Sequence, residues 1–286
     1  MLNSRGKAGA RTAAGRREAT IQNPGEVASY RVRAFNTAAA SENKIHDDTV
    51  ARRFGFTGGL VPGVEVYAYM THPALARWGR AWLERGAAEC RFLAPVYDGK
   101  IVDVVAADSG DRLAIKVESE GAICANGTAS LNGTTSTPKF ARFEAPLPPD
   151  MRPPADELSL ATGTRLGIRP FPISAEYAAE YLRDVRETDP LYAREGLAHP
   201  GIVLRLCNQA LVQNVVLGPW IHVGSTVRNF SAAEVGETLS LCAHVAGNYE
   251  RKGHRFVDLD VLVSAGERPI AEVNHVAIYR PRQVAS

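Results

Sequence analysis

Hydrophobic and polar residues alternate along six runs of the chain, and this pattern predicts two groups of β-strands. The runs are "IVDVVAA", "LAIKVES" and "AICANGTASL" in the first half, and "LSLCAHV", "FVDLDVLVS" and "IAEVNHVAIY" in the second. Each group follows a long apolar stretch, which begins at Pro62 in the first half and at Pro200 in the second. A stretch that is apolar on most of its surface predicts a buried helix.

The two halves repeat one another. Each long apolar stretch opens with Pro-Gly and is followed by an Arg–Phe step and a glycine turn. Pro62 precedes Arg91 by 29 residues, and Pro200 precedes Arg228 by 28. Such self-similarity indicates a duplicated unit. We therefore expect a flexible N-terminal arm over residues 1–27, a first repeat over 28–135, a linker over 136–160 and a second repeat over 161–282.

Composition narrows the function classes. Apolar residues make up 45% of the 286, enough for a sizeable core, and the net charge of +2 argues against nucleic acid as a partner. No run approaches the ~18 apolar residues of a membrane span. The basic stretch "MLNSRGKAGARTAAGRRE" lacks the apolar region of a secretory signal. Four scattered cysteines indicate reduced, buried thiols, so we expect a cytoplasmic protein.

Cofactor motifs are not found in the sequence. There is no HExxH, no paired Cys/His cluster, no GxGxxG after a predicted strand and no P-loop. We therefore expect neither a metal nor a redox cofactor.

The stretch "SENKIHDD", residues 41–48, carries the chief candidate for chemistry. The imidazole of His46 suits proton transfer because its ordinary pKa, ~6.5, lies near neutral pH. The competing interpretation is an exposed or backbone-capping loop histidine. Asp47 and Asp48 suit either a solvated face or an N-cap of "DTVARRFG". The segment "FTGGLVPG", residues 56–63, is either a plain loop or a glycine-rich backbone that a ligand approaches closely.

One buried helix wrapped by an antiparallel sheet, present twice, resembles the hot-dog fold. Two copies in one chain resemble a double hot dog, an α+β fold. The arrangement is similar to the MaoC-like family, which includes R-specific enoyl-CoA hydratases and dehydratases, and the resemblance covers about 250 residues after the N-terminal arm.

The family's signature is Asp-x-Asn-Pro-x-His on the loop that enters the helix. Residues 41–46, "SENKIH", keep Asn43 and His46 but have Ser41 in place of the catalytic Asp and Lys44 in place of Pro. The corresponding "ETDPLY", residues 187–192, has an acid at the Asp position but a tyrosine in place of His. Each repeat thus carries a different half of the expected pair, and the internal pseudo-twofold should hold the two halves apart.

The resemblance implies reversible addition of water to a 2-enoyl thioester of CoA or an acyl carrier protein, in fatty acid metabolism. His46 would transfer the proton, and Ser41, Glu42 or Asn43 would position the water. A helix N-terminus combines free N–H groups with a positive dipole end, so the helix start would polarise the thioester. The expected substrate-binding residues are Asn43, Gly59, Gly63 and Val64.

Other side chains keep two interpretations each. His199 either caps the second helix or lines a second pocket. Glu187 and Tyr192 form either a reduced second site or a structural half. Trp220 and His222 lie on a predicted strand, where core packing is the default for Trp220 and His222 is a candidate pocket residue.

Two other function classes remain open. The loss of the catalytic Asp fits a non-catalytic binding protein for acyl thioesters. Hydrolysis is the third class, because other hot-dog proteins hydrolyse acyl thioesters and Glu187 could act as the base. A homodimer of double hot dogs is a further expectation.

Overall fold

A single antiparallel sheet runs through the whole molecule. The structure is a computed structural model and describes residues 27–131, 137–140 and 142–282. The strands follow the order β1-β3-β4-β5-β2-β8-β11-β10-β9-β6, and the short β7 pairs with β9. Their bounds are β1 Val27–Arg33, β2 Gly86–Phe92, β3 Ile101–Asp108, β4 Arg112–Ser119, β5 Ala122–Leu131, β6 Arg165–Gly167, β7 Phe171–Pro172, β8 Ile221–Asn229, β9 Thr238–Arg251, β10 His254–Ala265 and β11 Arg268–Arg280.

The sheet consists of two equivalent halves joined along β2 and β8. Strands β3, β4, β5 and β2 of the first half correspond in order to β9, β10, β11 and β8 of the second. Residues Ala87–Arg91 pair antiparallel with Gly224–Arg228 at the centre. The predicted duplication and the six predicted strands are therefore confirmed, and the two repeats share one sheet.

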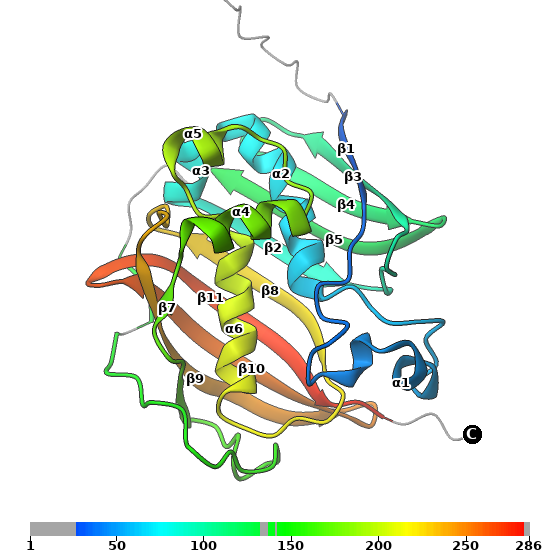
Figure 1. The fold of residues 1–286 in the computed structure, drawn as a ribbon, viewed down its shortest axis with the longest axis vertical. Helices are drawn as coiled ribbons and strands as arrows, with labels where there is room; N and C mark the ends of the chain where they lie inside the picture. Colours follow the sequence, from blue (N-terminus) through cyan, green and yellow to red (C-terminus); the bar gives the residue numbers. More distant parts are fainter. Residues whose placement is uncertain (1–26, 132–136, 141, 283–286) are drawn as a thin grey trace, which may run out of the picture.

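Each half wraps around one central helix, as Figure 1 shows. The central helices are α2 (Gly63–Trp78) and α6 (Gly201–Val212), so both begin directly after the prolines that the sequence marked. Most of their side chains are buried, which their nearly continuous apolar surfaces require. The fold class predicted from the pattern, two buried helices wrapped by antiparallel strands, is correct.

Of the smaller helices, the sequence pointed only to the one that begins at Asp48. The others span ten residues or fewer, too short to show a long apolar stretch. Two flank the central helix of the first repeat, and two precede that of the second. Their bounds are α1 Asp48–Arg53, α3 Arg80–Arg85, α4 Ala175–Asp184 and α5 Leu191–Glu195, together with a 3₁₀ turn, η1, at Lys44–His46.

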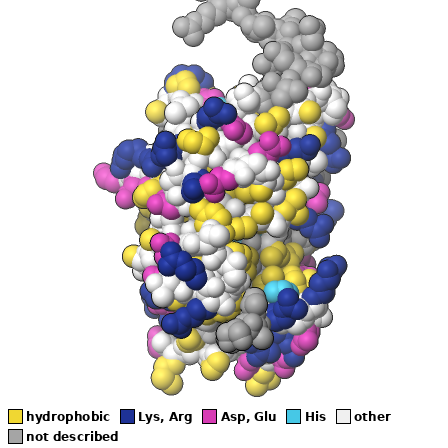
Figure 2. Space-filling view, turned by 90° about the vertical axis from the view of Figure 1, so that its right-hand side faces the viewer, with side chains coloured by type: hydrophobic (Ala, Val, Ile, Leu, Met, Phe, Trp, Pro, Cys, Tyr) yellow, Lys and Arg dark blue, Asp and Glu magenta, His cyan; other side chains and the backbone are white. Residues whose placement is uncertain are grey.

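The predicted N-terminal arm lies outside the described residues except for Val27, which begins β1. In the predicted linker, residues 137–140 and 142–160 form no helix or strand apart from an isolated bridge between Pro154 and Val216. All four cysteines are buried and unpaired, as expected. Among the described helices, none combines the length and apolarity needed to cross a membrane. The face that carries α1 and β1 mixes hydrophobic, basic and acidic side chains (Figure 2), in keeping with the small net charge.

Candidate functional site

The loop that contains His46 is an ordered turn. Asn43 caps η1 by accepting a hydrogen bond from the backbone N–H of Ile45. Asp47 then caps α1 by accepting from the N–H groups of Thr49 and Val50, at 2.9 and 3.0 Å, which confirms the N-cap interpretation. The carboxylate of Asp48 accepts from the Gly59 N–H at 2.7 Å and joins the turn to the segment before α2.

The ring of His46 is held in one orientation. Its Nδ1 lies 2.7 Å from the carbonyl oxygen of Leu60. A carbonyl only accepts, so Nδ1 carries the proton and Nε2 presents a lone pair. Burial lowers the pKa of His46 below its usual 6.5, although the bond to Leu60 opposes this effect. The imidazole is therefore neutral at physiological pH and has a basic Nε2.

Asn43 connects this loop to the other repeat. Its Nδ2 donates to the carbonyl of Trp220 at 3.0 Å, and its Oδ1 accepts from the Trp220 N–H at 3.2 Å. The same Nδ2 lies 3.3 Å from Nε2 of His46. Asn43 is buried, so these bonds are shielded from water. Asn43 therefore braces the loop, and it also fixes the segment that leads into β8.

The start of α2 presents free backbone donors next to His46. Among the described residues, the N–H groups of Gly63 and Val64 have no hydrogen-bond acceptor, as befits the first turn of a helix. A side chain at Gly63 would meet Phe92 at 3.0 Å and Nδ1 of His222 at 3.1 Å. A larger residue at this position would therefore push these two side chains aside by a few tenths of an ångström.

His222 is buried opposite this helix start. Its Nε2 lies 2.9 Å from Oγ of Ser225, which in turn lies 3.0 Å from Nδ1 of His275. Burial lowers the pKa of His222 to about 3, so the ring is neutral. Its Nδ1 has no partner among the described residues. His222 is thus a pocket residue, one of the two roles that the sequence left open for it.

Two pockets meet at His46. One has a volume of about 200 Å³ and a largely apolar wall, which includes Gly63, Phe92 and Val96. The other, about 700 Å³, extends along α6 towards α4 and has many polar side chains. Five residues line both pockets and mark their junction: Asn43, His46, Pro62, Asn208 and Trp220.

The remaining candidates from the sequence occupy different positions around this junction. Ser41, Glu42 and Val64 line the larger pocket. The side chain of Ser41 bonds the carbonyl of Asn43 at 3.3 Å, and the carboxylate of Glu42 pairs with Arg152 at 3.0 Å. Gly59 lines neither pocket, because it packs directly against the carbonyl of His46.

Two residues of the second repeat that line the site could not be predicted from the sequence. Asn208 reaches the junction from α6, and Trp220 lies in the loop immediately before β8 rather than on the predicted strand. Both positions depend on the pairing of the two repeats. A repeat-to-repeat alignment places them far from the His46 motif and cannot reveal the contact.

The corresponding site of the second repeat is closed. The Gly201 N–H, which corresponds to that of Gly63, donates to Nδ1 of His199 at 3.0 Å. The hydroxyl of Tyr181 occupies the space beside Gly201. The pocket at this helix start measures about 20 Å³, a tenth of its counterpart beside α2. His199 therefore caps the helix, one of the two roles that the sequence left open for it.

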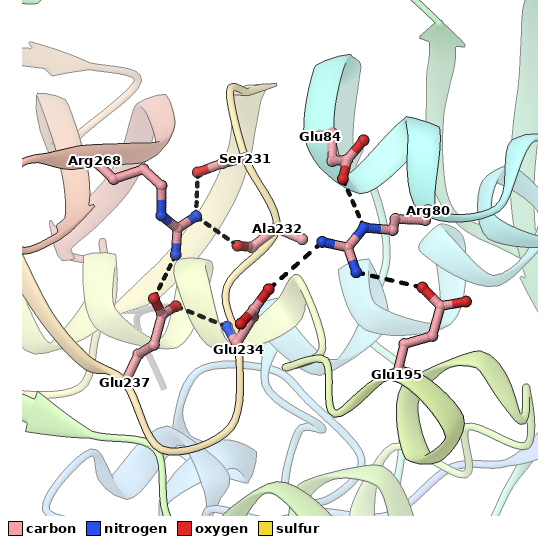
Figure 3. Close-up of polar contacts among 8 residues, drawn as sticks. All are labelled: Arg80, Glu84, Glu195, Ser231, Ala232, Glu234, Glu237 and Arg268. Carbon is pink, nitrogen blue, oxygen red and sulfur yellow. Dashed lines mark hydrogen bonds and ion pairs between the residues drawn. The ribbon is translucent and has the colours of Figure 1, made fainter.

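Ion pairs connect the segments next to this closed site. Arg80 of α3 contacts Glu84, Glu195 of α5 and Glu234, and so links the two repeats (Figure 3). Beside it, Arg268 binds Glu237, Ser231 and the carbonyl of Ala232. Ser231 and Ala232 also line the small pocket, so this network holds its wall in place.

No protein-family model matches the chain, and no curated protein sequence matches it. Solved structures do match. A candidate MaoC domain dehydratase from Chloroflexus aurantiacus superposes with a TM-score of 0.63 at 10% identity, over 91% of this chain and 97% of its own. A conserved hypothetical protein from Mycobacterium tuberculosis, described as having a double hot-dog fold, gives 0.63 at 15% identity, over 90% and 96%. The protein has the double hot-dog fold.

A third structural neighbour is the N-terminal dehydratase from the difficidin assembly line, with a TM-score of 0.50 at 11% identity, over 91% of this chain and 96% of its own. The resemblance to MaoC-like proteins is thereby confirmed for the fold. Within this double hot dog, the described residues contain no group of three His, Cys, Asp or Glu that could hold a metal ion.

Glu187, at the Asp position of the second repeat, is a structural anchor. Its carboxylate is 2% exposed and accepts from His72 at 2.8 Å and from the N–H groups of Thr188 and Asp189 at 2.7 Å. His199 lies 3.8 Å away. Burial alone raises the pKa of Glu187, but the nearby His199 and the hydrogen bond from His72 outweigh it and hold the pKa well below 4.5.

Glu187→Gln should therefore destabilise the protein without removing a working site. A lowered pKa in the folded state contributes stability above pH 4.5, and this contribution is lost as the pH falls below that value. We expect a loss of about 1.5–3 kcal/mol at pH 7, the range for hydrogen bonds to charged groups. Urea unfolding at several pH values should show the difference from the unmodified protein shrinking below pH 4.5. A constant difference would contradict the assignment.

Proposed function

We propose that this double hot dog catalyses the reversible addition of water to a 2-enoyl thioester, as a hydratase or dehydratase. One observation carries the proposal: a neutral histidine with a basic Nε2 lies at the junction of two pockets, next to a helix start whose N–H groups are free. The solved neighbours that share the fold include three described as dehydratases, one of them as a candidate. That likeness concerns the fold, so the reaction itself is argued from the site.

The chemistry requires a base, a proton donor and a site for negative charge. Nε2 of His46 takes a proton from water as the water oxygen bonds to Cβ of the enoyl group. The electron pair of the double bond moves towards the thioester, and the charge on its oxygen is met by the N–H groups of Gly63 and Val64. The imidazolium of His46 then gives its proton to Cα, which returns the ring to its neutral form.

Ser41 stands at the position of the family's catalytic Asp, so the water must be positioned in another way. Ser41 cannot act as a base at neutral pH, and its hydroxyl already contacts the backbone of Asn43. Glu42 is paired with Arg152, away from the imidazole. We assign the orientation of His46 to the Leu60 carbonyl, which holds Nδ1, and a water-positioning role to Ser41 in the wall of the larger pocket. Water replaces the longer contact of 3.3 Å between Nδ2 of Asn43 and Nε2 of His46.

A non-catalytic thioester-binding protein is the second candidate, because Ser41 replaces the family's acid. Hydrolysis with Glu187 as base is not favoured, since that carboxylate is buried, hydrogen-bonded and beside a pocket of only about 20 Å³.

The deciding experiment is incubation with 2-enoyl-CoA and 3-hydroxyacyl-CoA thioesters, followed by mass spectrometry. A gain or loss of one water supports the proposal, free CoA indicates hydrolysis, and binding without turnover indicates the second candidate.

His46→Ala should lower the rate of hydration by ~10²–10⁴-fold, the usual contribution of a general acid–base. Thioester affinity should change little, because most binding contacts lie along the acyl group and the carrier arm. His244→Ala is a matched control, since this histidine lies on β9 and lines neither pocket. Steady-state kinetics measures both variants. Full activity of His46→Ala would rule out its assigned role.

The pH profile should report the neutral form of His46. A general base works only when unprotonated, and burial places the pKa of this histidine below 6.5. We expect kcat/KM to be level around pH 7 and to fall on the acid side, with a midpoint below 6.5. Circular dichroism at each pH serves as the folding control. A midpoint at or above pH 7 would show that another group is the base.

Gly59→Ala should lower activity by displacing His46. A Cβ at this position would lie 2.2 Å from the carbonyl oxygen of His46, so the loop must move. A shift of about 1 Å at a catalytic group can cost about 10²-fold in rate. Gly218→Ala is the control, because nothing lies within 4 Å of its added methyl. Equal kinetics for both variants would indicate that Gly59 does not support the catalytic loop.

A further inference from the structure

The two pockets that meet at His46 differ in size and in the side chains that line them, since only the larger one has charged residues in its wall, and a thioester likewise has two different arms. One arm is the acyl group, which is mostly hydrocarbon. The other is the pantetheine arm of the carrier, which contains two amides and a hydroxyl. The reacting thioester must lie at the junction, so the two arms must leave it through different pockets.

The smaller pocket offers an amide chain few partners. Its wall is formed mainly by hydrocarbon side chains; of its polar ones, Asn43 is bonded to Trp220, and Asn208 and His222 present one unpartnered acceptor each among the described residues. An amide buried there without a partner would cost roughly 2–7 kcal/mol. The apolar members of the wall include Phe56, Val66, Phe92, Leu93, Val96 and Ile221.

The larger pocket offers hydrogen-bonding groups along its length. Three amide side chains of α6 and the turn that follows it line this pocket: Asn208, Gln209 and Gln213. Oδ1 of Asn208 is buried and has no partner among the described residues. A buried acceptor without a donor is costly, so this oxygen is suited to an N–H of the bound arm after a small rotation of its amide.

The charged residues of the larger pocket also support placing the pantetheine arm there. The larger pocket is lined by the acids Glu42, Glu65 and Asp184 and by the bases Arg152 and Arg205, which pair with them. The acids outnumber the bases by one, so the pocket favours the uncharged amide segment of the carrier over its phosphate end. The phosphates would remain outside.

We propose that the smaller pocket holds the acyl group and therefore limits the substrate to short or compact acyl thioesters, while the larger pocket holds the pantetheine arm. This rests on the proposed acyl-thioester function. A protein cavity of about 150 Å³ binds benzene, which has six carbons. At the same density, a pocket of about 200 Å³ holds about eight carbons. An octanoyl group should fit, and a dodecanoyl group should not.

The test is binding rather than turnover, so that it stands apart from the proposed reaction. Saturated butyryl-, octanoyl- and dodecanoyl-CoA carry no double bond to hydrate, and calorimetry gives their affinities. Affinity should rise from butyryl to octanoyl and then stop rising or fall at dodecanoyl. Octanoyl- and dodecanoyl-pantetheine, which lack the nucleotide, should show the same break. A continuous rise through dodecanoyl, or a break that disappears without the nucleotide, would overturn the proposal.

Two matched variants test which pocket holds the acyl group. Phe56 and Phe171 are half-buried phenyl rings that line the smaller and the larger pocket, respectively. Phe56→Ala should raise the dodecanoyl-to-butyryl affinity ratio about tenfold or more, and Phe171→Ala should leave it within about twofold. A ratio is insensitive to the fraction of folded protein. A larger change from Phe171→Ala, or equal changes from both variants, would overturn the assignment.

Discussion

The N–H group at the start of each central helix determines whether that repeat has an open site. A buried backbone donor needs a partner, and in the second repeat His199 supplies it to Gly201. In the first repeat the equivalent N–H of Gly63 has no acceptor among the described residues, and Gly63 lines a pocket. A thioester oxygen can therefore complete the helix start of the first repeat, whereas that of the second is already complete. The duplicated fold thus holds one open site.

That open site depends on both repeats. The two hydrogen bonds between Asn43 and the backbone of Trp220 hold the His46 loop against the entry to β8. Asn208 and His222 also come from the second repeat. The second repeat therefore has the same fold as the first, and its residues line the site of the first repeat. Its own acid, Glu187, anchors the packing between α2 and the loop before α5.

The fold could be predicted from the sequence because it follows from local pattern. Apolar stretches after Pro62 and Pro200, and strands that alternate in polarity, repeat with nearly the same spacing. The N-cap formed by Asp47 could also be predicted, because capping is a local property. Asn208 and Trp220 could not, since their position at the site depends on how β2 meets β8. Gly59 was expected at the ligand, but the distance of its backbone from that of His46 appears only in three dimensions.

One of the two equivalent sites is open, and the stoichiometry of binding tests this. Calorimetry measures it by titration of a saturated short-chain acyl-CoA into the intact protein. We expect one thioester per chain, because the pocket at α6 is a tenth the size of that at α2. Two thioesters bound per chain with similar affinity would contradict it.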